Sequence, residues 1–183
     1  MKKLLIITAI FLAIIVSGLA YYALVYTKSF SPDTDVNFEA NGLTIHINYD
    51  RPYKKGRVIF DSAGLVPYGK VWRTGANEAT VFETNQDLKI KDQILKKGTY
   101  SFFTLPGPTT WKIIFNSEYG QWGVDFNGMA NRDPKNDVLT VEVPAVVQQK
   151  EIEQFTIEVD QAGDEMELIL LWDKTLVAIP FSR

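Results

Sequence analysis

Residues 43–50 read LTIHINYD and form the clearest structural pattern in this chain of 183 residues. The apolar residues at positions 43, 45, 47 and 49 alternate with polar ones. Because successive side chains of a β-strand point to opposite faces, the alternation predicts a strand with one buried face and one solvated face. Arg51-Pro52 follows and ends the strand, since proline has no amide hydrogen to donate to a central ladder.

The two-residue period returns in the second half of the chain. The further strand predictions include Trp111 to Phe115, Leu139 to Val143, Phe155 to Val159, Met166 to Trp172 and Thr175 to Ile179. Asp173-Lys174 predicts a tight hairpin between the last two. About nine or ten short strands, without a persuasive amphipathic helix, indicate an all-β fold, an antiparallel β-sandwich or jelly-roll-like domain.

The amino-terminal segment predicts one long helix. An apolar run extends from Leu4 to Tyr26 and is preceded by Lys2 and Lys3. As a helix it would be about 34 Å long, enough to cross a hydrocarbon core of about 30 Å. Two interpretations stay open: an uncleaved transmembrane anchor, or a signal peptide that is cleaved after the small residues ending at Ala20. The length of the run and its terminal tyrosines favour the anchor.

These patterns divide the chain into three parts. Residues 1–28 form the membrane anchor or signal segment, residues 29–35 a polar linker with a proline, and residues 36–183 the β-domain. The lysines before the apolar run keep that end in the cytoplasm. We therefore expect a single-pass protein of the cell membrane whose domain faces the periplasm or exterior, or a secreted domain if the segment is cleaved.

Charge and cysteine content narrow the range of partners. The residues after the first thirty carry 16 basic and 22 acidic side chains, which leaves a formal charge of −6. Such a domain repels polyanions at long range, so neither nucleic acid nor an anionic lipid surface is expected as a partner. Cysteine is absent, which excludes disulfides, a thiolate nucleophile, thiolate metal ligands and a lipid-modified cysteine.

Residues 65–80, LVPYGKVWRTGANEAT, combine turn residues with chemically versatile side chains more densely than any other segment. The candidate ligand-binding residues are Tyr68, Arg73, Asn77 and Glu78 from this block, with Arg51 and Trp122 from elsewhere. Trp122 lies in a glycine-flanked loop, where we expect it to be partly exposed and able to stack on a sugar ring or a partner surface.

Two interpretations of this block stay open. Trp72 and Arg73 are neighbours on a predicted strand and therefore point to opposite faces. In the structural interpretation Trp72 joins the core, while Arg73 pairs with Glu78 or braces the turn through its planar guanidinium. In the functional interpretation Arg73 and Asn77 line a pocket for a carboxylate or for sugar hydroxyls.

The same block carries a resemblance to a known family. The matching segments are Val66 to Thr80, Tyr49 to Pro52, Lys55 to Arg57, Lys97 to Tyr100, Trp111 to Asn116 and Gln121 to Gly123. Together they resemble a bacterial envelope family known only as a domain of unknown function, numbered twenty-nine eleven, over roughly Asp35 to Ile179. The resemblance implies an exported protein and brings no activity or site residues. Asp50 stands where the family pattern implies a serine.

No complete catalytic constellation is present. His46 is the only histidine, and no Gly-x-Ser-x-Gly elbow accompanies it. It could contribute to a mixed metal site only with Asp50 and Glu78, and a solvated strand histidine is the simpler interpretation. The acidic loop around Asp125 lacks the glycine position of an EF-hand. We predict no metal site.

A phosphate-binding loop is also not predicted. Gly64 to Lys70 has the spacing of such a loop up to the lysine. Val71 stands in place of the residue whose hydroxyl would bind magnesium, and the bulky residues between leave few free amides. No cofactor is therefore expected.

Three functional hypotheses follow. The leading one is an extracytoplasmic, membrane-anchored module that binds a carbohydrate, a cell-wall component or a protein without catalysis. The second is an envelope hydrolase that uses Asp50, Glu78 or His46, with Arg73 as electrostatic stabiliser. The third is a purely structural envelope module.

Overall fold

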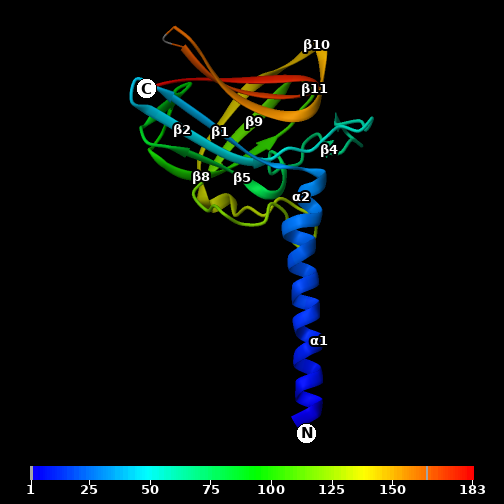
Figure 1. Ribbon diagram of the computed structural model, residues 1–183. Coiled ribbons are helices and arrows are strands. Elements are labelled where there is room, and N and C mark those ends of the chain that lie inside the picture. Colours follow the sequence, from blue (N-terminus) through cyan, green and yellow to red (C-terminus); the bar gives the residue numbers. More distant parts are fainter. Residues whose placement is uncertain (1, 164) are drawn as a thin grey trace.

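The computed structural model describes residues 2–163 and 165–183, and shows a long helix that carries a β-domain at its carboxyl end (Figure 1). Helix α1 spans Lys2–Tyr21, and the π-helical turn η1 (Tyr22–Tyr26) and the short helix α2 (Thr27–Phe30) continue it. By length and composition α1 can cross a membrane, and none of its residues is buried. An apolar helix of this length near the amino terminus is compatible with a signal anchor and with a signal peptide.

The β-domain consists of eleven strands within the described residues. Their bounds are β1 Asp33–Ala40, β2 Leu43–Asp50, β3 Phe60–Asp61, β4 Val66–Pro67, β5 Ala76–Thr84, β6 Leu88–Ile90, β7 Gln93–Leu95, β8 Gly98–Leu105, β9 Thr110–Asn116, β10 Asp137–Ala162 and β11 Glu165–Ser182. A short 3-10 helix, η2 (Pro134–Asn136), precedes β10. Strand β1 begins shortly after α2 ends, so the predicted linker of residues 29–35 overlaps both elements. Only Ser31 and Pro32 lie outside α2 and β1.

Nine strands form one antiparallel sheet in the order β1-β2-β5-β8-β9-β10-β11-β6-β7, and β3 and β4 form a separate parallel pair. Strand β10 joins the two halves, because residues 137–144 pair with β9 and residues 145–162 pair with β11. In Figure 1, β10 and β11 lie as a second layer across β1, β2, β5, β8 and β9. The predicted all-β, antiparallel fold is confirmed. The sandwich is realised in part, since its layers belong to one continuous folded sheet.

The hairpin between β1 and β2 turns at Asn41-Gly42. Both residues have positive φ, 49° and 80°, and Ala40 pairs with Leu43. This is the geometry of a two-residue hairpin turn, for which Asn-Gly is the preferred sequence. The alternation of β2 therefore continues backwards into β1, a strand that the sequence analysis omitted.

Strands β10 and β11 are longer than predicted. The expected hairpin at Asp173-Lys174 is wrong, because β11 continues through both residues. Asp173 does adopt a positive φ of 53°, but the pairing with β10 shifts register here instead of reversing. A residue with a left-handed backbone conformation can form part of a β-bulge as well as a turn. Asp173 adopts that conformation, but it lies at a register shift within β11 and not in a hairpin turn.

An aromatic cluster fills the core beneath the segment that carries the candidate site. Trp72 stacks on Trp172 with ring centroids 5.8 Å apart and an interplanar angle of 19°. Its ring also meets Phe155 at 4.9 Å and Phe60 at 5.9 Å edge to face. Such pairs fix ring orientations as well as burying apolar area. Trp72 is thus an anchor that holds its neighbour, Arg73, in a fixed place.

Candidate functional site

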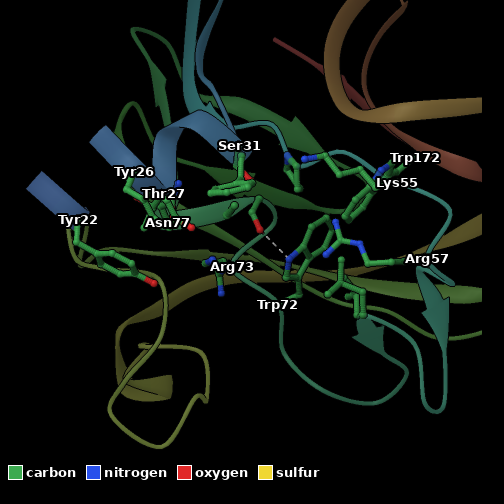
Figure 2. A pocket seen from close by; sticks show the side chains of 16 residues that line it. Tyr22, Tyr26, Thr27, Ser31, Lys55, Arg57, Trp72, Arg73, Asn77 and Trp172 are labelled. Carbon is green, nitrogen blue, oxygen red and sulfur yellow. Dashed lines mark hydrogen bonds between the residues drawn. The ribbon is translucent and has the colours of Figure 1, made fainter. Parts of the chain in front are cut away.

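The backbone on both sides of Arg73 is held rigidly. The amide of Trp72 donates to Thr104 O at 2.7 Å, and the amide of Thr104 donates back to Trp72 O at 3.0 Å. The Trp72 indole Nε1 donates to Gly75 O at 3.0 Å, the bond drawn as a dashed line in Figure 2. Trp72 thus forms an isolated β-bridge with Thr104, where the sequence predicted a strand, and the chain closes into a turn immediately after Arg73.

Thr74 and Asn77 both have left-handed backbone conformations, with φ of 56° and 51°. A β-branched residue seldom adopts positive φ, at a cost on the order of 1–3 kcal/mol. Three hydrogen bonds hold Thr74 there. Its hydroxyl bonds to Thr104 Oγ1 at 3.1 Å and donates to Trp72 O at 3.3 Å, while Thr80 Oγ1 donates to Thr74 O at 2.7 Å.

A cavity of about 420 Å³ lies between this turn and the end of the helix. Its walls come from Tyr22, Tyr26, Thr27, Phe30, Ser31, Pro52, Lys55, Arg57, Leu65, Val66, Trp72, Arg73, Gly75, Ala76, Asn77 and Trp172. Figure 2 shows the helical tyrosines on one side, Lys55, Arg57 and Trp172 on the other, and Arg73 between them. We call this space the junction cavity, because the helix and the β-domain each supply part of it.

Two buried donors in the walls of the junction cavity lack partners. Arg73 Nε and Asn77 Nδ2 are inaccessible to solvent and have no hydrogen-bond partner in the described chain. Burial lowers the pKa of the Arg73 guanidinium, and the charges of Asp50 and Glu78 oppose this shift. A guanidinium keeps its proton under all ordinary conditions, so Arg73 places a positive charge in the wall.

The loop at Gly123 closes the back of Arg73. A Cβ atom at this glycine would lie 2.0 Å from Arg73 Cδ and 2.8 Å from Asn77 O. The amide of Gly123 also donates to Asn77 O at 2.9 Å. Only a glycine allows the loop backbone to approach so closely, and the loop in turn presses Arg73 toward the cavity.

Positive charge is concentrated around the junction cavity. Its walls contain three cationic residues, Lys55, Arg57 and Arg73, and no acidic residue. The Lys55 ammonium lies 5.1 Å from the centroid of the Phe30 ring, a cation–π contact. Lys55 and Arg57 are exposed at the rim, whereas Arg73 lies deeper. The tyrosines of the helix form a stacked pair with centroids 5.4 Å apart and complete an aromatic wall.

An ion-pair network beside the junction cavity fastens the helix to the domain. Lys28 Nζ lies 3.0 Å from Asp50 Oδ1, 2.9 Å from Glu78 Oε2 and 3.6 Å from Asp33 Oδ1. The Asp50 side chain is only 1 % exposed. Burial, assisted by a hydrogen bond with Glu78, raises the pKa of Asp50 to about 6 despite the charge of Lys28.

When this carboxyl pair takes up a proton, Asp50 is the group that binds it. Burial alone would raise the pKa of Glu78, but the hydrogen bond from Asp50 and the ion pair with Lys28 lower it. The pKa of Lys28 is raised, because its bonds to Glu78 and Asp50 outweigh its own partial burial. Lys28 thus compensates a carboxylate that has almost no contact with water.

Two of the six predicted ligand-binding residues meet at the junction cavity. Arg73 and Asn77 line it together, as the functional interpretation expected. Glu78 is their neighbour but turns to Lys28. The expected pairing of Arg73 with Glu78 is limited to the influence of one charge on the other.

The remaining candidates lie outside the junction cavity. Arg51 donates to Phe155 O at 3.0 Å and to Thr156 Oγ1 at 2.7 Å, and so joins the end of β2 to β10. Tyr68 lines a separate space of only about 40 Å³. Trp122 is 38 % exposed, which confirms its expected partial exposure, and its backbone bridges to Glu78.

The other residues considered for catalysis or metal binding are engaged elsewhere. His46 Nε2 lies 2.9 Å from Asp35 Oδ1 at the surface. Asp125 Oδ1 accepts the amides of Asn127 and Met129 at 2.8 Å and 2.9 Å and thereby closes its own loop. Among the described residues no group of three or more His, Cys, Asp or Glu side chains could hold a metal ion.

The helical wall of the junction cavity was not predicted. Tyr26 and Lys28 were assigned to the anchor and Phe30 to the linker, and their contacts with residues 50–78 join segments distant in sequence. One signal was available for Lys28, the only charged residue between Lys3 and Asp33. Nothing local in the sequence indicates that Trp172 would share a wall with them.

The chain belongs to the family described as Protein of unknown function (DUF2911), which matches residues 31–181. The resemblance found in the sequence is thereby confirmed. No curated protein and no solved structure matches the chain significantly. The match begins at Ser31, so it includes the β-domain wall of the junction cavity and leaves Lys28 and the helical wall outside.

Proposed function

We propose that this protein is a membrane-anchored, extracytoplasmic binding module whose ligand occupies the junction cavity. The observation that carries the proposal is the pair of buried donors, Arg73 Nε and Asn77 Nδ2, in the wall of a space large enough for a small molecule. An unsatisfied buried polar group costs on the order of 1–3 kcal/mol. These two atoms are closed off from solvent, so a ligand that offers acceptor atoms would recover this cost when the Arg73 and Asn77 side chains turn toward the cavity on binding.

The two unpartnered groups define the ligand's chemistry. Both are donors, so the matching ligand groups are acceptors such as carboxylate, phosphate or hydroxyl oxygens. The planar guanidinium suits a bidentate oxyanion, and the aromatic walls suit an apolar or sugar-ring face. The remaining ligand surface would face the rim at Lys55 and Arg57.

The helix supports the proposed location. Helix α1 is long and apolar enough to span a bilayer, and Tyr22 and Tyr26 follow at the depth where aromatic side chains favour the lipid–water interface. Lys2 and Lys3 at the other end favour a cytoplasmic amino terminus. The β-domain would then stand directly on the outer surface of the membrane.

The other two hypotheses have less support. A hydrolase would need a carboxyl group that reaches a substrate, but Asp50 is buried and neither it nor Glu78 lines the junction cavity. A purely structural module would not need unpartnered donors in a cavity wall. The ion pairs of Lys28 with Asp50 and Glu78, by contrast, have a structural role, because they join the helix to the β-domain.

A ligand titration tests the binding function. Trp72 and Trp172 line the junction cavity, so tryptophan emission should report occupancy. The full chain in detergent is titrated with cell-wall fragments, neutral oligosaccharides and small oxyanions. We expect a saturable change for at least one class that is abolished by Arg73→Gln and retained in Lys112→Gln, a charge-matched control. Silence from every class, or an equal response in Arg73→Gln, would contradict the proposal.

A further inference from the structure

We propose that the face from which α1 projects rests on the outer leaflet, and that the junction cavity takes the phosphate of an anionic phospholipid headgroup. This inference rests on the proposed binding function and names the ligand class of the same site. It contrasts with the expectation from net charge that anionic lipid is repelled.

The walls of the junction cavity are positively charged. The walls hold Lys55, Arg57 and Arg73 without an acid, although the chain as a whole has a formal charge of −3. Beyond a Debye length of about 8–10 Å, the acids of the rest of the domain are largely screened. Asp50 and Glu78 lie close enough to act on Arg73, but both are paired with Lys28 and neither lines the cavity, so the three cations are the charges that a ligand meets. The planar guanidinium of Arg73 matches the geometry of a phosphate.

An exposed apolar loop lies on the side of the domain from which the helix projects. Figure 1 shows residues 117–136, in yellow-green, beside the top of the helix. Within this loop Phe126 is fully exposed, Tyr119 is 56 % exposed and Met129 is 54 % exposed, and Trp122 is also partly exposed. Large apolar side chains in water are unfavourable, whereas aromatic ones are stable at a lipid interface.

The loop borders a second cavity that adjoins the junction cavity. A second cavity of about 280 Å³ is lined by Met129 and Ala130 from the loop and shares Leu65 and Arg73 with the junction cavity. The side chain of Leu65 is itself 45 % exposed. A lipid whose phosphate reaches Arg73 would therefore have apolar surface beside it, and the helix would keep the cavity mouth at headgroup depth.

The test uses the full chain in nanodiscs of phosphatidylcholine with rising fractions of phosphatidylglycerol, followed by tryptophan emission. We expect a saturable, salt-sensitive change with phosphatidylglycerol. Arg73→Gln should weaken it at least tenfold, and Lys112→Gln should leave it unchanged. Phe126→Ser, which removes an exposed side chain, should weaken the lipid response without altering the melting temperature.

A second arm identifies the source of the phosphate. Glycerol phosphate is added to the protein in pure phosphatidylcholine nanodiscs. If glycerol phosphate saturates the site while phosphatidylglycerol has no effect, the ligand is a soluble phosphate and the lipid assignment is overturned. A third outcome is the same tryptophan emission in phosphatidylcholine and in phosphatidylglycerol, no effect of Arg73→Gln and no response to glycerol phosphate. That outcome would show that the site binds no anionic ligand. In that case an Arg73-dependent response to neutral oligosaccharides would preserve the binding function, and its absence would remove that as well.

Discussion

Arg73 is the residue on which the site depends, and its setting explains why. Trp72 fixes the backbone from the core side, Thr74 closes the turn in a left-handed conformation, and Gly123 leaves no room for Arg73 to move toward the loop. A flexible arginine is thus held with its Nε unpartnered. A strained backbone conformation or an unpartnered buried polar group persists only where the surrounding structure holds it in place. Such features are found most often at functional sites.

Gly123→Ala tests this constraint at the residue scale. The added methyl group would overlap Arg73 Cδ and approach Asn77 O, so we expect the unfolding free energy to fall by about 3 kcal/mol. Gly120→Ala is the control, because Gly120 has φ of +84° and open space around it and should lose only about 1 kcal/mol. Urea unfolding measures both. Equal effects would show that backbone conformation, and not the contact with Arg73, decides the cost.

Asp50 gives a prediction for pH. Its pKa in the folded chain is about 6, above the unfolded value of 3.8, so the folded chain binds more protons between these values. Stability should therefore fall as the pH rises from about 4 to about 6, by on the order of 1–3 kcal/mol. The lowered pKa of Glu78 offsets part of this loss. Asp50→Asn should flatten the profile of melting temperature against pH.

Asp87 serves as a control, because its contribution to stability should change with pH in the opposite direction to that of Asp50. The Asp87 carboxylate accepts bonds from Lys96 and the Lys97 amide, which lower its pKa. Its stabilisation is present above the unfolded pKa and is lost as the pH falls, so Asp87→Asn should lower stability at neutral pH only. If the stability of the wild type fell no more steeply between pH 4 and 6 than that of Asp50→Asn, the raised pKa of Asp50 would be refuted.

At the scale of elements, the helix and the domain are joined by charge. The short helix α2 contributes Lys28, and β2 and β5 contribute Asp50 and Glu78. Removing one partner of a buried pair leaves an uncompensated charge, which is far more costly than the pair itself is favourable. Among the described residues, Lys28 therefore carries the ion pairs of this junction, beside the contact of Lys55 with the Phe30 ring.

Lys28→Met should expose this dependence. At pH 7.5 we expect a loss of about 2–3 kcal/mol, because the buried Asp50 carboxylate loses its counter-charge. At pH 5 the loss should be smaller, since Asp50 can take up a proton. Lys54→Met is the matched control: Lys54 also bridges two carboxylates, but those of Glu151 and Asp173 are 49 % and 25 % exposed, so we expect under about 1 kcal/mol. Equal losses in chemical unfolding would contradict this account.

Elements also show how far sequence patterns reach. The alternation in residues 43–50 correctly predicted β2 and the all-β class, because burial of one face is a local property. The Asn41-Gly42 turn was an available signal for β1 and was not used. The hairpin at Asp173 failed because a positive φ suits either a turn or a bulge, and only long-range pairing decides between them.

At the scale of the whole molecule, the site could not be predicted in full. Arg73 and Asn77 were chosen as candidates from their residue types within one polar block, and both line the junction cavity. Arg51 and Tyr68 belong to the same family-like motifs but serve other contacts. The opposite walls come from residues 22–31 and from Trp172, and their convergence depends on the folding of one long sheet.

The fate of the apolar helix is a further prediction at this scale. We expect the helix to stay uncleaved, because its apolar run is longer than a typical signal region of about 7–15 residues. Intact-mass measurement of the protein from its native membrane should give the full chain, with the protein resistant to alkaline extraction. A mature protein that begins at Tyr21 would contradict the anchor, although Tyr22 and Tyr26 would still remain beside the junction cavity.

The central claim is that a ligand fills the junction cavity through Arg73. Native mass spectrometry of the full chain, released from its own membrane, tests this claim most directly. We expect the wild-type protein to retain one molecule with the mass of an anionic phospholipid. Arg73→Gln should lose this molecule, and Lys112→Gln should retain it. A bare wild-type protein, or the same adduct on all three, would contradict it.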